Sequence, residues 1–113
     1  MTRWTFDEQQ QTGELKVSGA VTVSQVAEIR KLLLKALDQA PLVRLDLGQV
    51  EAIDIAGLQL FCAAHRLADR TGRCLAIVAL GEPVLKLVHE AGFAHLPVCD
   101  QDRQSACFWA RRT

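Results

Sequence analysis

The stretch AIDIAGLQLF, residues 52–61, shows where a strand gives way to a helix. Apolar residues precede Asp54, and after Gly57 they recur at helical spacing. Asp is among the best helix N-caps, so we expect Asp54 to begin the helix. Strand-to-helix turns often carry reactive groups, yet only Ile55 and Ala56 stand between Asp54 and Gly57. The stretch therefore predicts a corner of an α/β fold and leaves open whether that corner is a working site.

Upstream of this corner the pattern predicts two strands and a helix. Apolar residues alternate over residues 3–7 and 15–21, which indicates a β-hairpin. Thr22 and Gln25 have the spacing of a capping box, in which the Thr hydroxyl accepts from the Gln25 amide and the Gln25 side chain reaches back. The helix expected over residues 26–40 carries one apolar face.

Downstream the same alternation of strands and helices continues. Residues 42–47 predict a strand with one face in the core, and the helix that begins at Asp54 should end at Thr71-Gly72. The unbroken apolar run over residues 74–80 is typical of a central strand. A further helix, residues 82–92, has its apolar face at Val84, Leu85, Val88 and Ala91.

These elements predict the α/β class: a mixed, mostly parallel sheet with an N-terminal β-hairpin and about four helices packed on it. The chain of 113 residues has room for one core, which we assign to residues 1–99, including a short strand at residues 95–98. Residues 100–113 are expected to be a C-terminal tail. Its short helix would bear Phe108 and Trp109 and pack on the domain or mediate dimers.

Composition excludes several classes of function. The 13 basic and 13 acidic residues give a net charge of zero, which argues against a nucleic-acid binder; Arg103, Arg111 and Arg112 are expected to form a solvated face. No apolar run approaches the roughly 20 residues of a membrane span, so we expect a cytoplasmic protein without direct membrane insertion. The four cysteines have no metal-ligand spacing, and no metal site is expected.

The sequence also lacks the usual catalytic patterns. Neither GxxxxGK[ST] nor GxGxxG occurs, and no nucleophile elbow is present. Asp46 and Asp54 are expected mid-strand and at a strand end, so they form no evident acid–base pair. His65 shares an apolar helical stripe with Phe61 and Cys62 and is expected in the core. We therefore expect no catalytic residue, no cofactor and no enzyme.

Three segments together resemble the STAS domains of bacterial anti-sigma factor antagonists, the SpoIIAA-like family. The segment VRLDLGQVEAIDIAGLQLFCAAHRLADRTG (43–72) is similar to their strand, DxxGL loop and helix. LAIVALGEPVLKLVHEAGF (75–93) and LKVSGAVTVSQVAEIRKLL (15–33) are similar to the neighbouring strand–helix units. DxxGL alone is a weak motif, and its βαβα context makes the resemblance more specific.

The resemblance implies a protein-binding module that is switched by phosphorylation of a hydroxyl just before the loop Gly. In this sequence that position is Ala56, and the preceding position, often Ser or Thr in the family, is Ile55. An acidic residue common in the family's first loop would fall at Thr22 and is absent. No phosphorylation is therefore expected at the family position. Thr22, Ser24 and Ser18 are the nearby alternatives, expected rather as helix caps and a strand residue.

The implied docking surface surrounds this loop. Without a phosphate it would stay neutral, Gly57 would let a partner backbone approach, and Ile55 and Leu58 would offer apolar contacts. The expected partner-binding residues are Thr22, Asp54, Ile55, Ala56, Gly57 and Leu58.

The resemblance leaves two kinds of partner open. One is an anti-sigma or histidine-kinase-like ATPase of a signalling system, including chemotaxis complexes. The other is the ATPase of an ABC lipid (phospholipid) transporter, for which the chain would be a cytoplasmic STAS accessory subunit. Those subunits commonly keep a Thr where this chain has Ile55, which counts against the second reading. The sequence leaves the choice between monomer and homodimer open.

Overall fold

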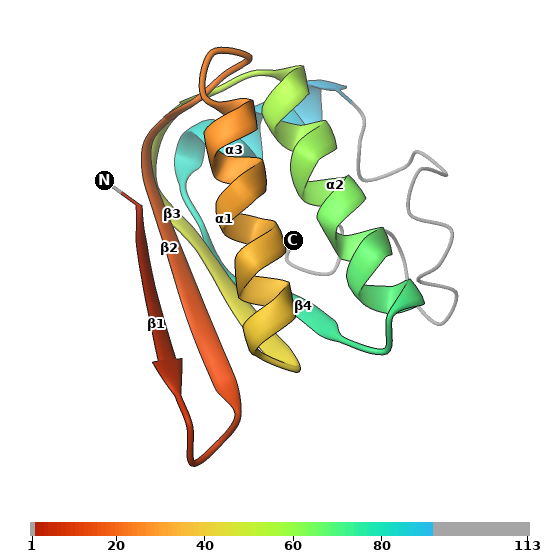
Figure 1. Ribbon diagram of the computed structural model, residues 1–113. Helices are drawn as coiled ribbons and strands as arrows, with labels where there is room; N and C mark the ends of the chain where they lie inside the picture. Colours follow the sequence, from red (N-terminus) through yellow and green to blue (C-terminus); the bar gives the residue numbers. More distant parts are fainter. Residues whose placement is uncertain (1, 92–113) are drawn as a thin grey trace.

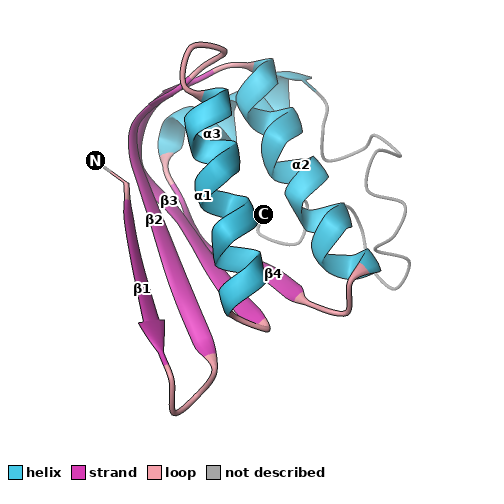
Figure 2. Cartoon of the chain, in the orientation of Figure 1, coloured by secondary structure: helices cyan, strands magenta, loops and turns pink. Residues whose placement is uncertain are grey.

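The computed structural model describes residues 2–91, which form an α/β unit with four strands and three helices. The elements, in chain order, are β1 (Arg3–Asp7), β2 (Thr12–Val21), α1 (Val26–Gln39), β3 (Leu42–Ile53), α2 (Ile55–Arg70), β4 (Cys74–Leu80) and α3 (Glu82–Ala91). The strands lie in the order β1-β2-β3-β4 (Figure 2). β1 pairs antiparallel with β2, and the other two pairings are parallel. The predicted mixed, mostly parallel sheet with its N-terminal hairpin is confirmed.

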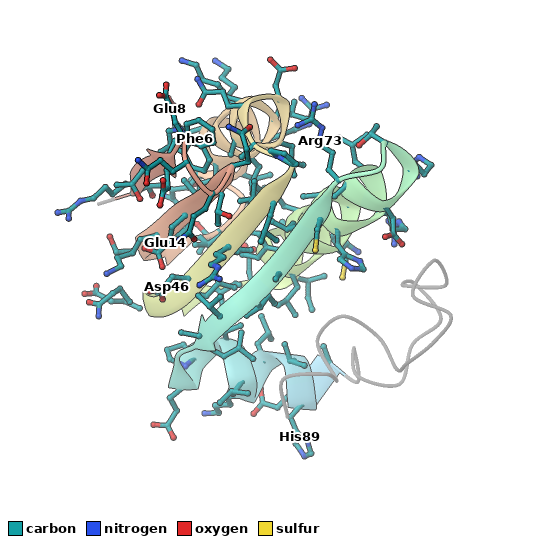
Figure 3. The ribbon with its side chains drawn as sticks, turned by 90° about the horizontal axis from the view of Figure 1, so that it is seen from below. Phe6, Glu8, Glu14, Asp46, Arg73 and His89 are labelled. Carbon is teal, nitrogen blue, oxygen red and sulfur yellow. The ribbon has the colours of Figure 1, made fainter. Side chains whose placement is uncertain are left out.

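The helices α1 and α2 lie side by side on one face of the sheet (Figure 1). Both are crossover helices between parallel strands, and this places them on the same face. α3 lies away from α1, beyond β4 (Figure 3). The sheet side chains under the helices are apolar and buried, namely Leu15, Val17, Val43, Leu45, Leu47, Leu75 and Ile77.

Over β2 and β3 the opposite face of the sheet is polar. Glu14 and Lys16 of β2 lie beside Arg44 and Asp46 of β3, and Figure 3 labels the two acids. Lys16 Nζ is 4.0 Å from Asp46 Oδ2, and both side chains retain contact with solvent. Such an exposed ion pair contributes little to stability.

The hairpin is fastened to α1 by an aromatic side chain. Trp4 donates from Nε1 to Gln39 Oε1 at 2.7 Å. Its ring lies over Gly13, where a Cβ would fall 2.0 Å from a ring carbon. A side chain at position 13 would therefore prevent the Trp4 ring from packing against the sheet there.

β3 is longer than predicted, because it continues beyond Leu47 to Ile53. Its parallel pairing with β2 continues across two register shifts, one between Lys16 and Ser18 and one between Gly19 and Ala20. The extra residues break the alternation of apolar side chains, so the sequence pattern ended the strand too early.

Within residues 2–91, β4 pairs with β3 alone and is the last strand of the described sheet. One detail of α3 differs from the sequence prediction. On α3 the side chain of Leu85 is 37% exposed, whereas Leu87 packs against the core beside the buried Val84 and Val88. The predicted strand 95–98 and the tail helix within 100–113 lie outside the described residues.

Candidate docking site

The loops that follow parallel strands meet at one edge of the sheet, and two of them form a corner. The loop after β2 passes beside the start of α2, which follows β3 (Figure 1). We call residues 22–25 together with residues 54–57 the β2–α2 corner. In open α/β sheets this edge is the usual location of binding sites.

Asp54 holds the corner together with both carboxylate oxygens. Oδ1 accepts from the Gly57 amide at 3.1 Å and caps α2, as predicted. Oδ2 accepts from the Val23 amide at 2.9 Å, and so ties the loop after β2 to the helix. The Asp54 amide donates to the Val21 carbonyl at 3.3 Å. Since both oxygens bind backbone amides, the role that the geometry gives Asp54 is structural.

The predicted capping box does not cap α1: its N-cap is Gln25, which forms no side-chain cap hydrogen bond, and the Thr22–Gln25 contacts close the turn before the helix. The Gln25 side chain reaches back as predicted, and its Oε1 accepts from the Thr22 amide at 3.0 Å. The Thr22 hydroxyl, however, donates to Gln25 Oε1 at 2.6 Å, and the Gln25 amide donates to the Thr22 carbonyl at 2.8 Å. The hydroxyl was predicted to accept from that amide. The turn is tighter than a capping box requires, so the backbone carbonyl occupies the position that the hydroxyl would take.

Two apolar side chains of the corner face solvent. Val23 is 71% exposed and Ile55 is 41% exposed. They flank Asp54, which binds the Val23 amide and precedes Ile55 in the chain. The sequence analysis identified Ile55 but missed Val23, whose only signal is an apolar residue within the polar turn Thr-Val-Ser-Gln. Together the two side chains form a small apolar patch on either side of a hydrogen-bonded carboxylate.

Gly57 and Leu58, two of the expected partner-binding residues, are both buried. Leu58 is fully buried. A Cβ at Gly57 would lie 2.5 Å from the Val21 carbonyl oxygen and 2.9 Å from Ile53 Cγ1. Gly57 therefore permits close packing of α2 on β2 of its own chain, where the sequence suggested the approach of a partner backbone.

Thr22, Asp54, Ile55 and Ala56 remain at the corner. Thr22, Asp54 and Ala56 are half-buried, and Ser24 beside them is exposed. His65 is buried on α2, as predicted. Within residues 2–91 no group of three His, Cys, Asp or Glu side chains is placed to hold a metal ion. None of the helices in this part of the chain is long and apolar enough to cross a membrane.

A family model described as "Mlab, STAS domain" matches residues 4–98. The chain belongs to the STAS domain family. A comparison with curated protein sequences finds no significant match.

Solved structures show the same STAS fold. An anti-sigma factor antagonist from Mycobacterium paratuberculosis is 19% identical with a TM-score of 0.70, covering 82% of this chain and 78% of that one. A putative anti-sigma factor antagonist from Thermotoga maritima is 16% identical with a TM-score of 0.68, covering 81% and 79%. Unphosphorylated SpoIIAA, also an anti-sigma factor antagonist, is 15% identical with a TM-score of 0.64, covering 81% of each chain.

Proposed function

We propose that this STAS chain is a non-enzymatic interaction module that docks on an anti-sigma or histidine-kinase-like ATPase through the β2–α2 corner. The observation that supports the proposal is the pair of exposed aliphatic side chains, Val23 and Ile55. They lie on either side of Asp54, whose carboxylate accepts two backbone hydrogen bonds. The amides of Val23, Asp54 and Gly57 are already hydrogen-bonded within the chain, so a partner can cover these three groups without leaving them unpaired.

We further propose that the corner is permanently competent to bind. Ala56 and Ile55 cannot accept a phosphate where relatives carry a hydroxyl. A phosphate there would add nearly two negative charges beside Asp54 and would repel an apolar or acidic partner. The Thr22 hydroxyl is engaged with Gln25, so Ser24 is the more accessible alternative acceptor at the corner. Regulation, where it occurs, then acts on the partner.

A transporter ATPase is the second candidate partner. The matched family model takes its description from Mlab and not from an anti-sigma factor antagonist. The same corner would serve as the docking surface, because both kinds of partner would meet an unphosphorylated STAS loop with exposed aliphatic side chains.

Matched baits test the proposal. The wild-type chain and the double variant Val23→Asp/Ile55→Asp are used to recover partners from the cells in which the chain is native. Leu85→Asp serves as the control, because Leu85 is similarly exposed but lies on α3. We expect wild type and the control to retain an ATPase that the double variant loses at least about tenfold, since each new carboxylate would be buried without a partner.

Mass spectrometry of the retained ATPase then separates a signalling kinase from a transporter subunit. Equal recovery by all three baits would contradict docking at the corner.

A further inference from the structure

An apolar groove runs between α1 and α2, away from the β2–α2 corner. It encloses a hollow of about 250 Å³, lined by Arg30, Leu33 and Leu34 of α1 and by Leu60, Ala63, Ala64, Leu67 and Arg70 of α2. Leu34 is 38% exposed and Ala63 is exposed, so the floor of the groove is open to solvent. The two helices contact each other beneath it (Figure 1).

The groove carries a positive charge at each end. Arg30 lies near the start of α1, and Arg70 is the last residue of α2. Because both helices begin at the same edge of the sheet, Arg30 and Arg70 line the groove toward its opposite ends. Both residues are exposed, and neither forms an ion pair with any residue in the 2–91 range. Apolar side chains thus lie between two cations that are free to bind carboxylates.

We propose that this groove binds an acidic amphipathic helix of a protein partner. Such a helix presents apolar side chains at spacings of three and four residues, which would fill the floor formed by Leu34, Leu60 and Leu67. Its Asp or Glu side chains would pair with Arg30 and Arg70, the residue type best suited to bidentate carboxylate contacts.

Other occupants fit the groove less well. Its volume lies below the roughly 300–1,000 Å³ typical of small-molecule pockets and suits a few aliphatic side chains. A second copy of this chain, packed groove to groove about a two-fold axis, would bring arginines toward arginines. Of these occupants, an acidic helix from a different protein fits the groove best.

The groove and the corner are separate surfaces, so this proposal goes beyond the docking function proposed above. A partner that uses both would bind with two linked contacts, and each would raise the effective concentration at the other. The groove contact would also weaken as salt concentration rises, because its arginines are exposed and their pairing is screened.

Fluorescence anisotropy with two designed peptides tests the proposal. Each peptide has about 16 residues with Leu at helical i, i+3, i+4 and i+7 spacing; one carries Glu on its flanks and the other carries Lys. We expect the Glu peptide to bind wild type at least about tenfold more tightly than the Lys peptide. Arg30→Glu/Arg70→Glu should remove that preference, whereas Arg3→Glu on the exposed edge of β1 should keep it.

A second variant tests the apolar floor without changing charge. Ala63→Trp should fill the groove and weaken binding of the Glu peptide about tenfold, while the exposed position lets the helix fold. Ile55→Asp should leave peptide affinity unchanged, which separates the groove from the corner. Three results would overturn the proposal. They are no binding of the Glu peptide to wild type, equal affinity of wild type for both peptides, and binding of wild type to phosphatidylglycerol vesicles but to neither peptide.

Discussion

At the scale of single residues, Gly57 and Leu58 of the DxxGL motif pack within the fold, although the motif suggested that they contact a partner. The sequence correctly predicted the cap at Asp54, because Asp before an apolar periodic run has one dominant local role. It could not show which side of the first helical turn faces β2. That depends on how close α2 lies to Val21, a contact between residues 36 positions apart in the chain.

Gly57→Ala should therefore destabilise the fold. The new Cβ would lie 2.5 Å from the Val21 carbonyl oxygen, and backbone atoms cannot move aside as a flexible side chain can. We expect the free energy of unfolding to fall by about 1–3 kcal/mol, although Ala favours helices more than Gly does. Urea denaturation followed by circular dichroism measures the change. Gln59→Ala, exposed on the same helix, is the control and should stay within about 0.5 kcal/mol of wild type. An unchanged or raised stability of Gly57→Ala would refute the steric account.

At the scale of elements, the loop after β2 and the start of α2 form one unit because they share the Asp54 carboxylate. The sequence predicted one half of this arrangement, the helix cap, which is local. The bond to Val23 spans 31 positions and had no local signal. The same limit explains why β3 was predicted to end at Leu47. The last residues of β3 pair with β2 across register shifts. Their apolar and polar side chains do not alternate, so the sequence pattern does not identify them as part of the strand.

Two substitutions at Asp54 separate its two bonds. Asp54→Asn keeps one carbonyl oxygen, which can cap α2, but it cannot also accept from the Val23 amide. We expect a loss of about 0.5–1.5 kcal/mol for Asp54→Asn and about 1–3 kcal/mol for Asp54→Ala.

Amide hydrogen exchange supplies the diagnostic readout for these variants. The Asn variant should expose the Val23 amide while protecting that of Gly57, and the Ala variant should expose both. Asp69→Asn, on the exposed side of α2, should change neither amide. Equal protection of the Val23 amide in wild type and Asp54→Asn would show that the carboxylate does not tie the loop to the helix.

At the scale of the whole molecule, strand–helix alternation predicted the class and the parallel neighbours, because crossover connections allow few arrangements. The periodicity of α2 likewise predicted its buried stripe, including Phe61, Cys62 and His65. The exposed pair Val23 and Ile55 was only half predicted, because exposure is a property of the assembled molecule. The Asp54 carboxylate binds the Val23 amide and precedes Ile55, so both side chains lie beside the start of α2, next to Ala56.

The most direct test of permanent docking at the β2–α2 corner is the affinity of Ala56→Asp for the ATPase recovered with the wild-type chain, measured by calorimetry. The variant places a negative charge at the position to which the family resemblance assigns a phosphate, and Ala56→Ser is the matched neutral control. We predict that Ala56→Asp binds at least about tenfold more weakly. Ala56→Ser should bind as wild type does, and both variants should retain the wild-type circular dichroism spectrum. An unchanged affinity of folded Ala56→Asp would contradict the account and place the docking surface elsewhere on the molecule.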